Sequence, residues 1–260
     1  MKKWYLITSI GVALVFAFLF SRDSLANLVW QKIHRPNIAL ILLNKDEKLA
    51  MQLGSYYFNG GAYNLAKAKK AYEKALKSDP NPLWANYQLA RIYFVEGDSL
   101  KALEYINKEL DFYPENLRSL YVRGLIYGYR GQDLDLEKAE ADFKRFTLWA
   151  PKEWAGYNDL AWVLSKNGKY KEAKEAISAA FREISESENN PWLWNGLGVA
   201  ELNLQNYSEA RRAFEKAKDL ASNLTLNDWQ RSYPGNDPIT YKQGLEDFHA
   251  AIEENLRRVP

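Results

Sequence analysis

The stretch that decides the fold runs from Asn81 to Pro114 and reads NPLWANYQLARIYFVEGDSLKALEYINKELDFYP. Apolar residues recur every three or four positions in two segments, 82–96 and 99–111, which is the spacing of amphipathic helices. Gly97 interrupts the pattern between the segments, and Pro114 follows the second one, where a helix cannot continue. The stretch therefore predicts two helices joined by a tight turn.

The same unit recurs along the chain. Pro80 and Pro114 lie 34 residues apart, and a further proline, Pro151, closes the next unit. In each unit a small residue opens the second helix and a bulky apolar residue follows four positions later. The small residues are Ala68, Ala102, Ala139, Ala173 and Ala210, and the bulky ones are Tyr72, Ile106, Phe143, Ile177 and Phe214. Three positions after the bulky residue, three units have an alanine and the other two do not. The alanines are Ala75, Ala180 and Ala217, and the exceptions are Glu109 and Phe146.

This pattern resembles the tetratricopeptide repeat (TPR) family, whose helix pairs recur every 34 residues. The resemblance implies an all-α fold, a right-handed α-solenoid of about five TPR helix pairs between residues 46 and 222. The expected repeats are 46–80, 81–114, 115–151, 152–189 and 190–222. Ser185 replaces the closing proline in the fourth repeat, which is a departure from the family pattern.

An uncharged run from Trp4 to Phe20 follows Lys2 and Lys3. As a helix it would reach roughly 25 Å, slightly less than the roughly 30 Å hydrocarbon core of a membrane. We expect residues 1–22 to form a single transmembrane anchor, with the repeats outside the cytoplasm. The alternative is a signal peptide cleaved near Ser24–Ala26, which would give a secreted protein.

Residues 23–45 form a connector and an N-terminal cap. Leu25, Leu28, Val29 and Ile33 make one apolar stripe, and the run 38–43 is expected to form a half-helix that covers the first repeat. At the other end, residues 223–260 are expected to form a loop, 223–236, and then a capping helix that begins at Asp237-Pro238. The apolar face of that helix holds Tyr241, Leu245, Phe248, Ile252, Leu256 and Val259.

Composition excludes several kinds of chemistry. The chain has no cysteine, so disulfides and cysteine-ligated zinc are excluded. A net charge of +2 without a basic stripe argues against nucleic acid as a partner. The two histidines, His34 and His249, lack the spacing of metal ligands, and the chain contains no nucleophile, metalloprotease or phosphate-loop motif. We therefore expect neither enzymatic activity nor a catalytic residue, metal or cofactor.

The resemblance implies a different kind of site, because the first helix of each TPR pair lines a concave groove. Trp162, Leu125 and Val199 are expected to fill space between these helices. The residues expected to contact a partner combine aromatic area with polar groups, as interface anchors do. They are Trp84, Tyr87, Arg91, Arg118, Tyr121, Asn158, Trp192 and Asn195.

The leading hypothesis is therefore a membrane-anchored scaffold that binds a protein or peptide partner in its groove, within a cell-envelope complex. Arg91 and Arg118 are expected to face one concave surface beside Tyr87 and Tyr121. The alternative is a glycan- or peptide-binding protein outside the cytoplasm that stacks sugar rings on groove aromatics. For a glycan these would be Trp84, Tyr87, Tyr121 and Trp192.

Overall fold

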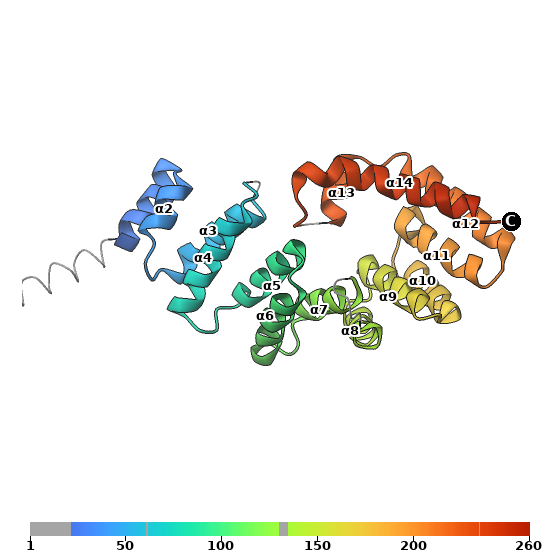
Figure 1. Cartoon of the computed structure of the whole chain (residues 1–260), viewed down its shortest axis with the longest axis horizontal. Coiled ribbons are helices and arrows are strands. Elements are labelled where there is room, and N and C mark those ends of the chain that lie inside the picture. The colour runs from blue at the N-terminus through green and yellow to red at the C-terminus, as the bar shows by residue number, and fades with distance from the viewer. Residues whose placement is uncertain (1–21, 61, 130–134, 234) are drawn as a thin grey trace, which may run out of the picture. The chain divides into compact units, whose positions relative to one another are not determined.

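The computed structural model describes residues 22–60, 62–129, 135–233 and 235–260, and every regular element within them is a helix (Figure 1). The chain forms two compact units, residues 1–92 (unit 1) and residues 93–260 (unit 2). The predicted all-α fold is confirmed.

The described part of unit 1 starts with helical residues 22–28. A π-helical turn (Val29–Ile33), α2 (Pro36–Leu42), α3 (Glu47–Phe58), α4 (Leu65–Ser78) and most of α5 (Ala85–Glu96) follow. Asp46 caps α3 by accepting a 2.9 Å hydrogen bond from the Leu49 amide, which satisfies one of the free donors at a helix start. Helix α3 packs closely on α4, since a methyl group on Gly54 would lie 2.5 Å from the Tyr72 ring.

The described residues of unit 2 contain α6 and the six repeat helices after it, followed by the C-terminal segment. Its helices are α6 (Ser99–Phe112), α7 (Leu117–Tyr129), α8 (Leu136–Trp149), α9 (Trp154–Lys166), α10 (Tyr170–Glu183), α11 (Pro191–Asn203), α12 (Tyr207–Ala221), α13 (Leu226–Ser232) and α14 (Tyr241–Arg257). Within the pairs, α7 packs on α8, α9 on α10 and α11 on α12. Helix α9 also contacts both α7 and α11, so the first helices of three successive repeats are neighbours.

The predicted packing register is confirmed. All five small residues that open the second helices and all five bulky residues that follow them are at most 1% exposed. Glu109, the charged exception, is also completely buried. The turn in the deciding stretch is confirmed as well, because Gly97 takes a φ of +84°, a conformation that suits glycine at a helix end. Helix α5 begins at Ala85, three residues later than predicted, and Trp84 just before it has a φ of +77°.

Of the N-terminal apolar stripe, Val29 is buried, whereas Leu25, Leu28 and Ile33 are about half exposed. One prediction about the connecting segments is wrong. Residues 223–236 are not a loop, since they contain α13. The run 38–43 does form most of a helix, α2. Of the apolar face predicted for the capping helix, Ile252 in α14 and Val259 just after it are buried.

The predicted membrane anchor, residues 1–22, lies outside the described residues except for Arg22. Across the described ranges, none of the helices has the length and apolar character that a membrane span requires.

Candidate protein-binding surface

In unit 1 the predicted site residues gather at the start of α5. The rings of Trp84 and Tyr87 meet edge to face, with centroids 5.3 Å apart. The Arg91 guanidinium lies 5.6 Å from the centroid of the Tyr87 ring and 4.8 Å from that of Phe58 on α3, which is the geometry of cation–π contacts. The structure therefore brings Trp84, Tyr87 and Arg91 together.

Two polar groups fix the Arg91 side chain further. It donates hydrogen bonds of 2.9 Å to the Gln88 side-chain oxygen and 3.2 Å to that of Asn59, the residue that ends α3. A guanidinium held over aromatic rings keeps a defined orientation, and its donors form a planar fork. This cluster can recognise a carboxylate or a backbone carbonyl beside an apolar group.

In unit 2 two of the predicted residues, Tyr121 and Asn158, contact a buried carboxylate. Asp159 on α9 is only 7% exposed and accepts hydrogen bonds from the Tyr121 hydroxyl at 2.5 Å and the Tyr129 hydroxyl at 2.7 Å, both from α7. The Asn158 amide adds a long contact of 3.4 Å. Arg118 is exposed one turn before Tyr121. The carboxylate thus fixes the two tyrosines between neighbouring first helices.

The titration of this group follows from its burial. Burial raises the pKa of the Asp159 carboxyl, while the hydrogen bonds from Tyr121, Tyr129 and Asn158 lower it in part. Burial and the nearby negative charge of Asp159 also raise the pKa of the Tyr129 hydroxyl. The Tyr129 ring stacks on Trp162 with centroids 4.0 Å apart. Asp159 is therefore part of the packing between α7 and α9.

Trp192 and Asn195 on α11 contact the chain's own C-terminal segment. Trp192 is 7% exposed and stacks on Phe248 of α14 and on Trp154 of α9, with centroids 5.3 Å apart in both pairs. The Asn195 side-chain oxygen accepts a 3.1 Å hydrogen bond from Asn255 of α14. Both side chains are thus engaged in contacts inside unit 2.

Of the residues expected to fill space between first helices, Trp162 is placed as predicted, since it lies on α9 and stacks on Tyr129 of α7. Leu125 and Trp162 pack against a buried cluster formed by α8, α9, α10 and α11. Val199 instead packs against α12 and the residue Val259 that follows α14. Sequence reasoning missed Trp229, in α13, and Tyr233, at the end of that helix. The centroids of their rings lie 4.4 Å apart, and both rings approach Trp192. The signal that could have found them is Thr225-x-x-Asp228, a capping box that starts α13.

The described residues contain no group of acidic or histidine side chains that could hold a metal ion. Two other buried carboxylates, those of Asp142 and Glu201, pair with cations at the helix surfaces. Arg123 donates two hydrogen bonds of 2.8 Å to Asp142, and Lys174 lies 2.8 Å from Glu201. These pairs connect neighbouring helices, and their role is structural.

Comparisons with known proteins agree with this architecture. Tetratricopeptide repeat family profiles match residues 47–82, 71–104 and 158–224. The photosystem I assembly protein Ycf3 of Acaryochloris marina is 34% identical over 45% of this chain and 75% of its own length. The chain therefore belongs to the tetratricopeptide repeat family.

Two further similarities cover more of the chain. BBSome complex member BBS4 of Bos taurus is 26% identical over 82% of this chain, which spans only 39% of that longer protein. The crystal structure of MamA superposes with a TM-score of 0.57 at 20% identity, covering 68% of this chain and 92% of MamA. At this identity the second match concerns the fold alone.

Proposed function

We propose that the chain is a membrane-anchored scaffold that binds a protein or peptide partner through the first helices of its repeats. The observation that carries the proposal is the placement of Arg118, Tyr121 and Asn158 on the adjacent helices α7 and α9, with Arg118 exposed to solvent. The proposed anchor is residues 1–22, and the repeats lie outside the cytoplasm in a cell-envelope complex. The proposal includes no catalytic step and no cofactor.

The chemistry of the surface indicates the kind of partner. Arginine forms paired hydrogen bonds with carboxylates, and it can do so beside an aromatic ring that covers apolar groups. Arg118 precedes Tyr121 by one turn of α7, and in unit 1 Arg91 lies over Tyr87. An extended peptide with acidic and apolar side chains fits both groups. Two of the relatives are an assembly protein, Ycf3, and a complex member, BBS4, which supports a role in complexes.

The alternative, a glycan stacked on groove aromatics, is less well supported. Of its four residues, Trp192 is buried between Trp154 and Phe248, so its ring has little free face for a sugar. Tyr121 is in contact with the rings of Phe143 and Phe146. Only Trp84 and Tyr87, which lie together in unit 1, keep the arrangement that the alternative requires.

Crosslinking in intact membranes, followed by pull-down of the full chain, separates the two functions. A partner protein captured in fixed stoichiometry, and lost from an Arg118→Ala/Tyr121→Phe chain, supports the scaffold. The matched control is Lys108→Ala, which removes an exposed ion pair within the second helix α6. Retention of the chain on purified cell-wall glycan, without a protein partner, would reject the scaffold in favour of the alternative.

A further inference from the structure

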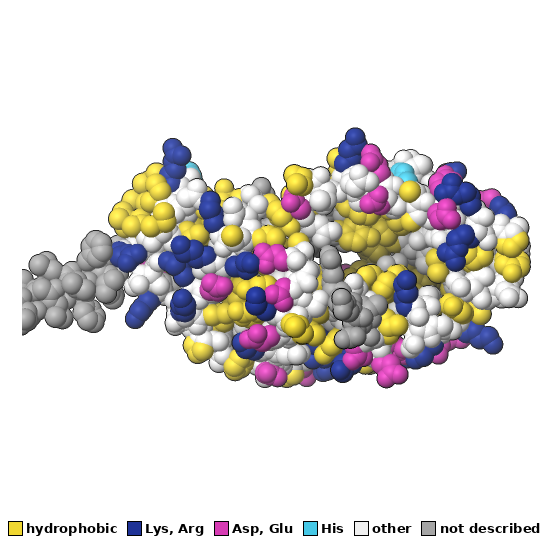
Figure 2. All heavy atoms as spheres, in the orientation of Figure 1, with side chains coloured by type: hydrophobic (Ala, Val, Ile, Leu, Met, Phe, Trp, Pro, Cys, Tyr) yellow, Lys and Arg dark blue, Asp and Glu magenta, His cyan; other side chains and the backbone are white. Residues whose placement is uncertain are grey.

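Large aliphatic side chains are exposed together at the start of unit 1. Leu25, Leu28, Ile33, Ile38 and Ile41 are between 47% and 65% exposed, and we call them the N-terminal apolar patch. Figure 2 shows hydrophobic side chains gathered where α2 lies in Figure 1, bordered by Lys and Arg. A cap that only met water would turn its large aliphatic residues inward. This surface is therefore suited to an apolar environment.

The patch is held firmly on unit 1. The Asp23 carboxylate accepts hydrogen bonds of 2.6 Å from the Asn44 amide and 3.0 Å from the Lys45 amide, which ties residues 22–28 to the turn before α3. The Lys74 ammonium on α4 donates to the carbonyl oxygens of Leu40 and Leu43 at the end of α2. The exposed side chains consequently form one rigid surface with the first repeat.

The patch also lies beside the point where the uncharged N-terminal run ends. The Arg22 guanidinium donates a 3.2 Å hydrogen bond to the carbonyl oxygen of Ile41. Phe20, the last residue of the uncharged run, is two residues away, and two residues of chain span at most about 7 Å. If residues 1–22 anchor the chain, the patch is necessarily close to the lipid surface.

The charges around the patch are suited to anionic lipid. Lys32, Arg35 and Lys45 are exposed, whereas the carboxylates of Asp23 and Asp46 accept hydrogen bonds within unit 1. Basic side chains strengthen binding to an anionic membrane surface by about fivefold each. Aliphatic side chains flanked by lysine and arginine are typical of segments that lie in the interface between head groups and acyl chains.

We propose that the N-terminal apolar patch docks on the surface of an anionic lipid membrane and holds unit 1 against it in a fixed orientation. The inference rests on the anchor of the proposed function and adds to it a second contact. Leu25, Leu28, Ile33, Ile38 and Ile41 enter the boundary of the acyl chains. Lys32 and Arg35 meet the lipid phosphates.

The test uses the full chain, which has no cysteine of its own, reconstituted in phosphatidylcholine vesicles with or without phosphatidylglycerol. A nitroxide label is placed at Ile41→Cys in the patch or, as the matched control, at Leu100→Cys, which is 83% exposed in unit 2. We expect the label at position 41 to be accessible to oxygen and protected from a water-soluble nickel chelate. The control label should be accessible to the chelate. The double variant Lys32→Gln/Arg35→Gln should lower the ratio of docked to undocked chain by about fivefold for each residue changed, and only in anionic vesicles.

Each other outcome contradicts the inference in a different way. If the chain stays with the vesicles after an alkaline wash but the label at position 41 is as accessible to nickel as the control, docking is wrong and the anchor stands. If the chain washes off, the anchor is wrong and the inference falls with it. If the labels at position 41 show spin–spin broadening that disappears on dilution with unlabelled chain, a second copy covers the patch and the lipid does not.

Discussion

Asn255 on α14 donates a 3.1 Å hydrogen bond to the side-chain oxygen of Asn195 on α11, across 60 residues of sequence. The contact lies in a longer interface in which α14 packs against α11 and α12. Lys218 and Glu253 extend this interface with an ion pair of 2.7 Å between α12 and α14. The last repeat therefore presents Asn195 to the chain's own final helix.

We expect Phe248→Ala to loosen that final helix. Phe248 stacks on Trp192 and also approaches Trp229, so its removal takes an aromatic neighbour from both. Because Phe248 is only partly buried, the loss of unfolding free energy should be about 2 kcal/mol, below the usual cost in a full core. Hydrogen exchange of residues 226–257 measures the effect. Phe112→Ala, at an exposed position in the same unit, should change little, and unchanged protection of α14 in the Phe248 variant would contradict the packing role.

Two glycines on α11 provide a test of the repeat packing. A methyl group on Gly198 would lie 2.4 Å from the Phe214 ring, whereas one on Gly196 would lie 3.3 Å from the end of the Ile177 side chain. Gly198→Ala should therefore destabilise the chain by about 1–3 kcal/mol. Gly196→Ala, on the same helix, should be neutral or stabilising by up to about 1 kcal/mol because alanine favours helix. Thermal unfolding of both variants decides, and equal melting temperatures would mean that the packing is wrong.

The corresponding change in the third repeat is Gly124→Leu. A methyl group there already lies 2.9 Å from the Phe143 ring, so a leucine must displace the ring or separate α7 from α8. Ala90→Leu in unit 1 is a similar case, because Ala90 is completely buried. We expect each to lower the unfolding free energy by at least about 1–3 kcal/mol. Urea denaturation measures it.

The core of the repeats could be predicted from sequence because a 34-residue period assigns each alanine and each bulky residue to the same place in every helix pair. The period also identifies which positions lie on the first helices. It does not reveal what covers them, and for that reason Trp192 and Asn195 were expected to meet a partner. Contacts across 60 residues, such as Asn195 with Asn255, depend on the path of the chain after the last repeat.

The connectors were harder to predict for a related reason. Outside the repeats no period fixes which side of a helix packs inward, so the stripe alone did not reveal that Val29 is buried while Leu25 and Leu28 are about half exposed. Helix α13 is seven residues long, too short for its apolar periodicity to be recognised, and only its capping box marks it. Asp159 was visible on a first helix, but its burial depends on two tyrosines from the preceding repeat.

The buried Asp159 predicts a specific pH dependence of stability. Its pKa in the folded chain is raised above the ordinary 3.8, so the folded state binds this proton more tightly than the unfolded state does. Its contribution to stability is thus complete below about pH 4 and is lost as the pH rises through the folded pKa. The loss amounts to about 1.4 kcal/mol for each pH unit by which the folded pKa exceeds 3.8.

Comparison with Asp159→Asn isolates this contribution, since asparagine does not titrate and the other groups cancel. Urea unfolding of both chains between pH 4 and pH 8 should show the wild type losing stability relative to the variant. A relative gain with rising pH would mean that the tyrosine hydrogen bonds outweigh burial. Asp159→Ala is expected to be destabilising at every pH, by about 1–3 kcal/mol, because it leaves the Tyr121 and Tyr129 hydroxyls without their acceptor.

The last prediction concerns partner binding. We expect an Arg91→Ala/Arg118→Ala chain to lose the partner while its circular dichroism and melting temperature stay nearly unchanged. Truncation of an interface anchor typically costs about 2 kcal/mol or more of binding, whereas exposed ion pairs add about 0–1 kcal/mol to stability. Because Arg91 lies in unit 1 and Arg118 in unit 2, the single variants show which unit carries the contact.

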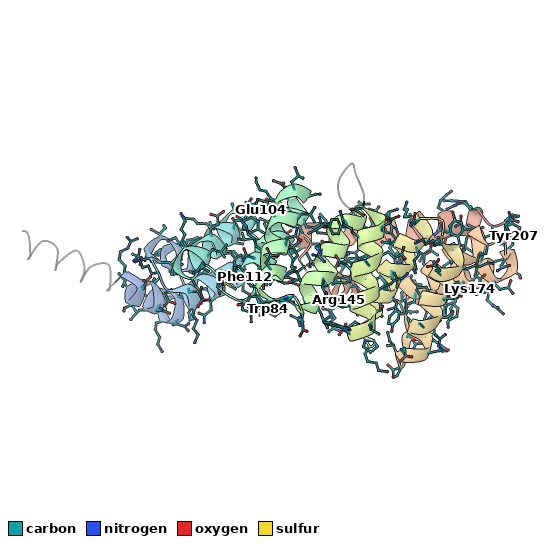
Figure 3. The ribbon with its side chains drawn as sticks, turned by 90° about the horizontal axis from the view of Figure 1, so that it is seen from below. Trp84, Glu104, Phe112, Arg145, Lys174 and Tyr207 are labelled. Carbon is teal, nitrogen blue, oxygen red and sulfur yellow. The ribbon has the colours of Figure 1, made fainter. Side chains whose placement is uncertain are left out.

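Arg145→Ala is the matched control for this pair (Figure 3). Arg145 is also exposed and also lies over an aromatic ring, with its guanidinium 4.4 Å from the Trp149 centroid, but it belongs to α8, the second helix of its repeat. The second helix of each repeat does not line the groove that the family resemblance implies, so the Arg145→Ala variant should bind the partner as the wild type does. Equal loss of binding in the single variants Arg91→Ala, Arg118→Ala and Arg145→Ala would indicate a nonspecific contribution of positive charge. Full binding by the double variant would place the partner on another surface of the chain.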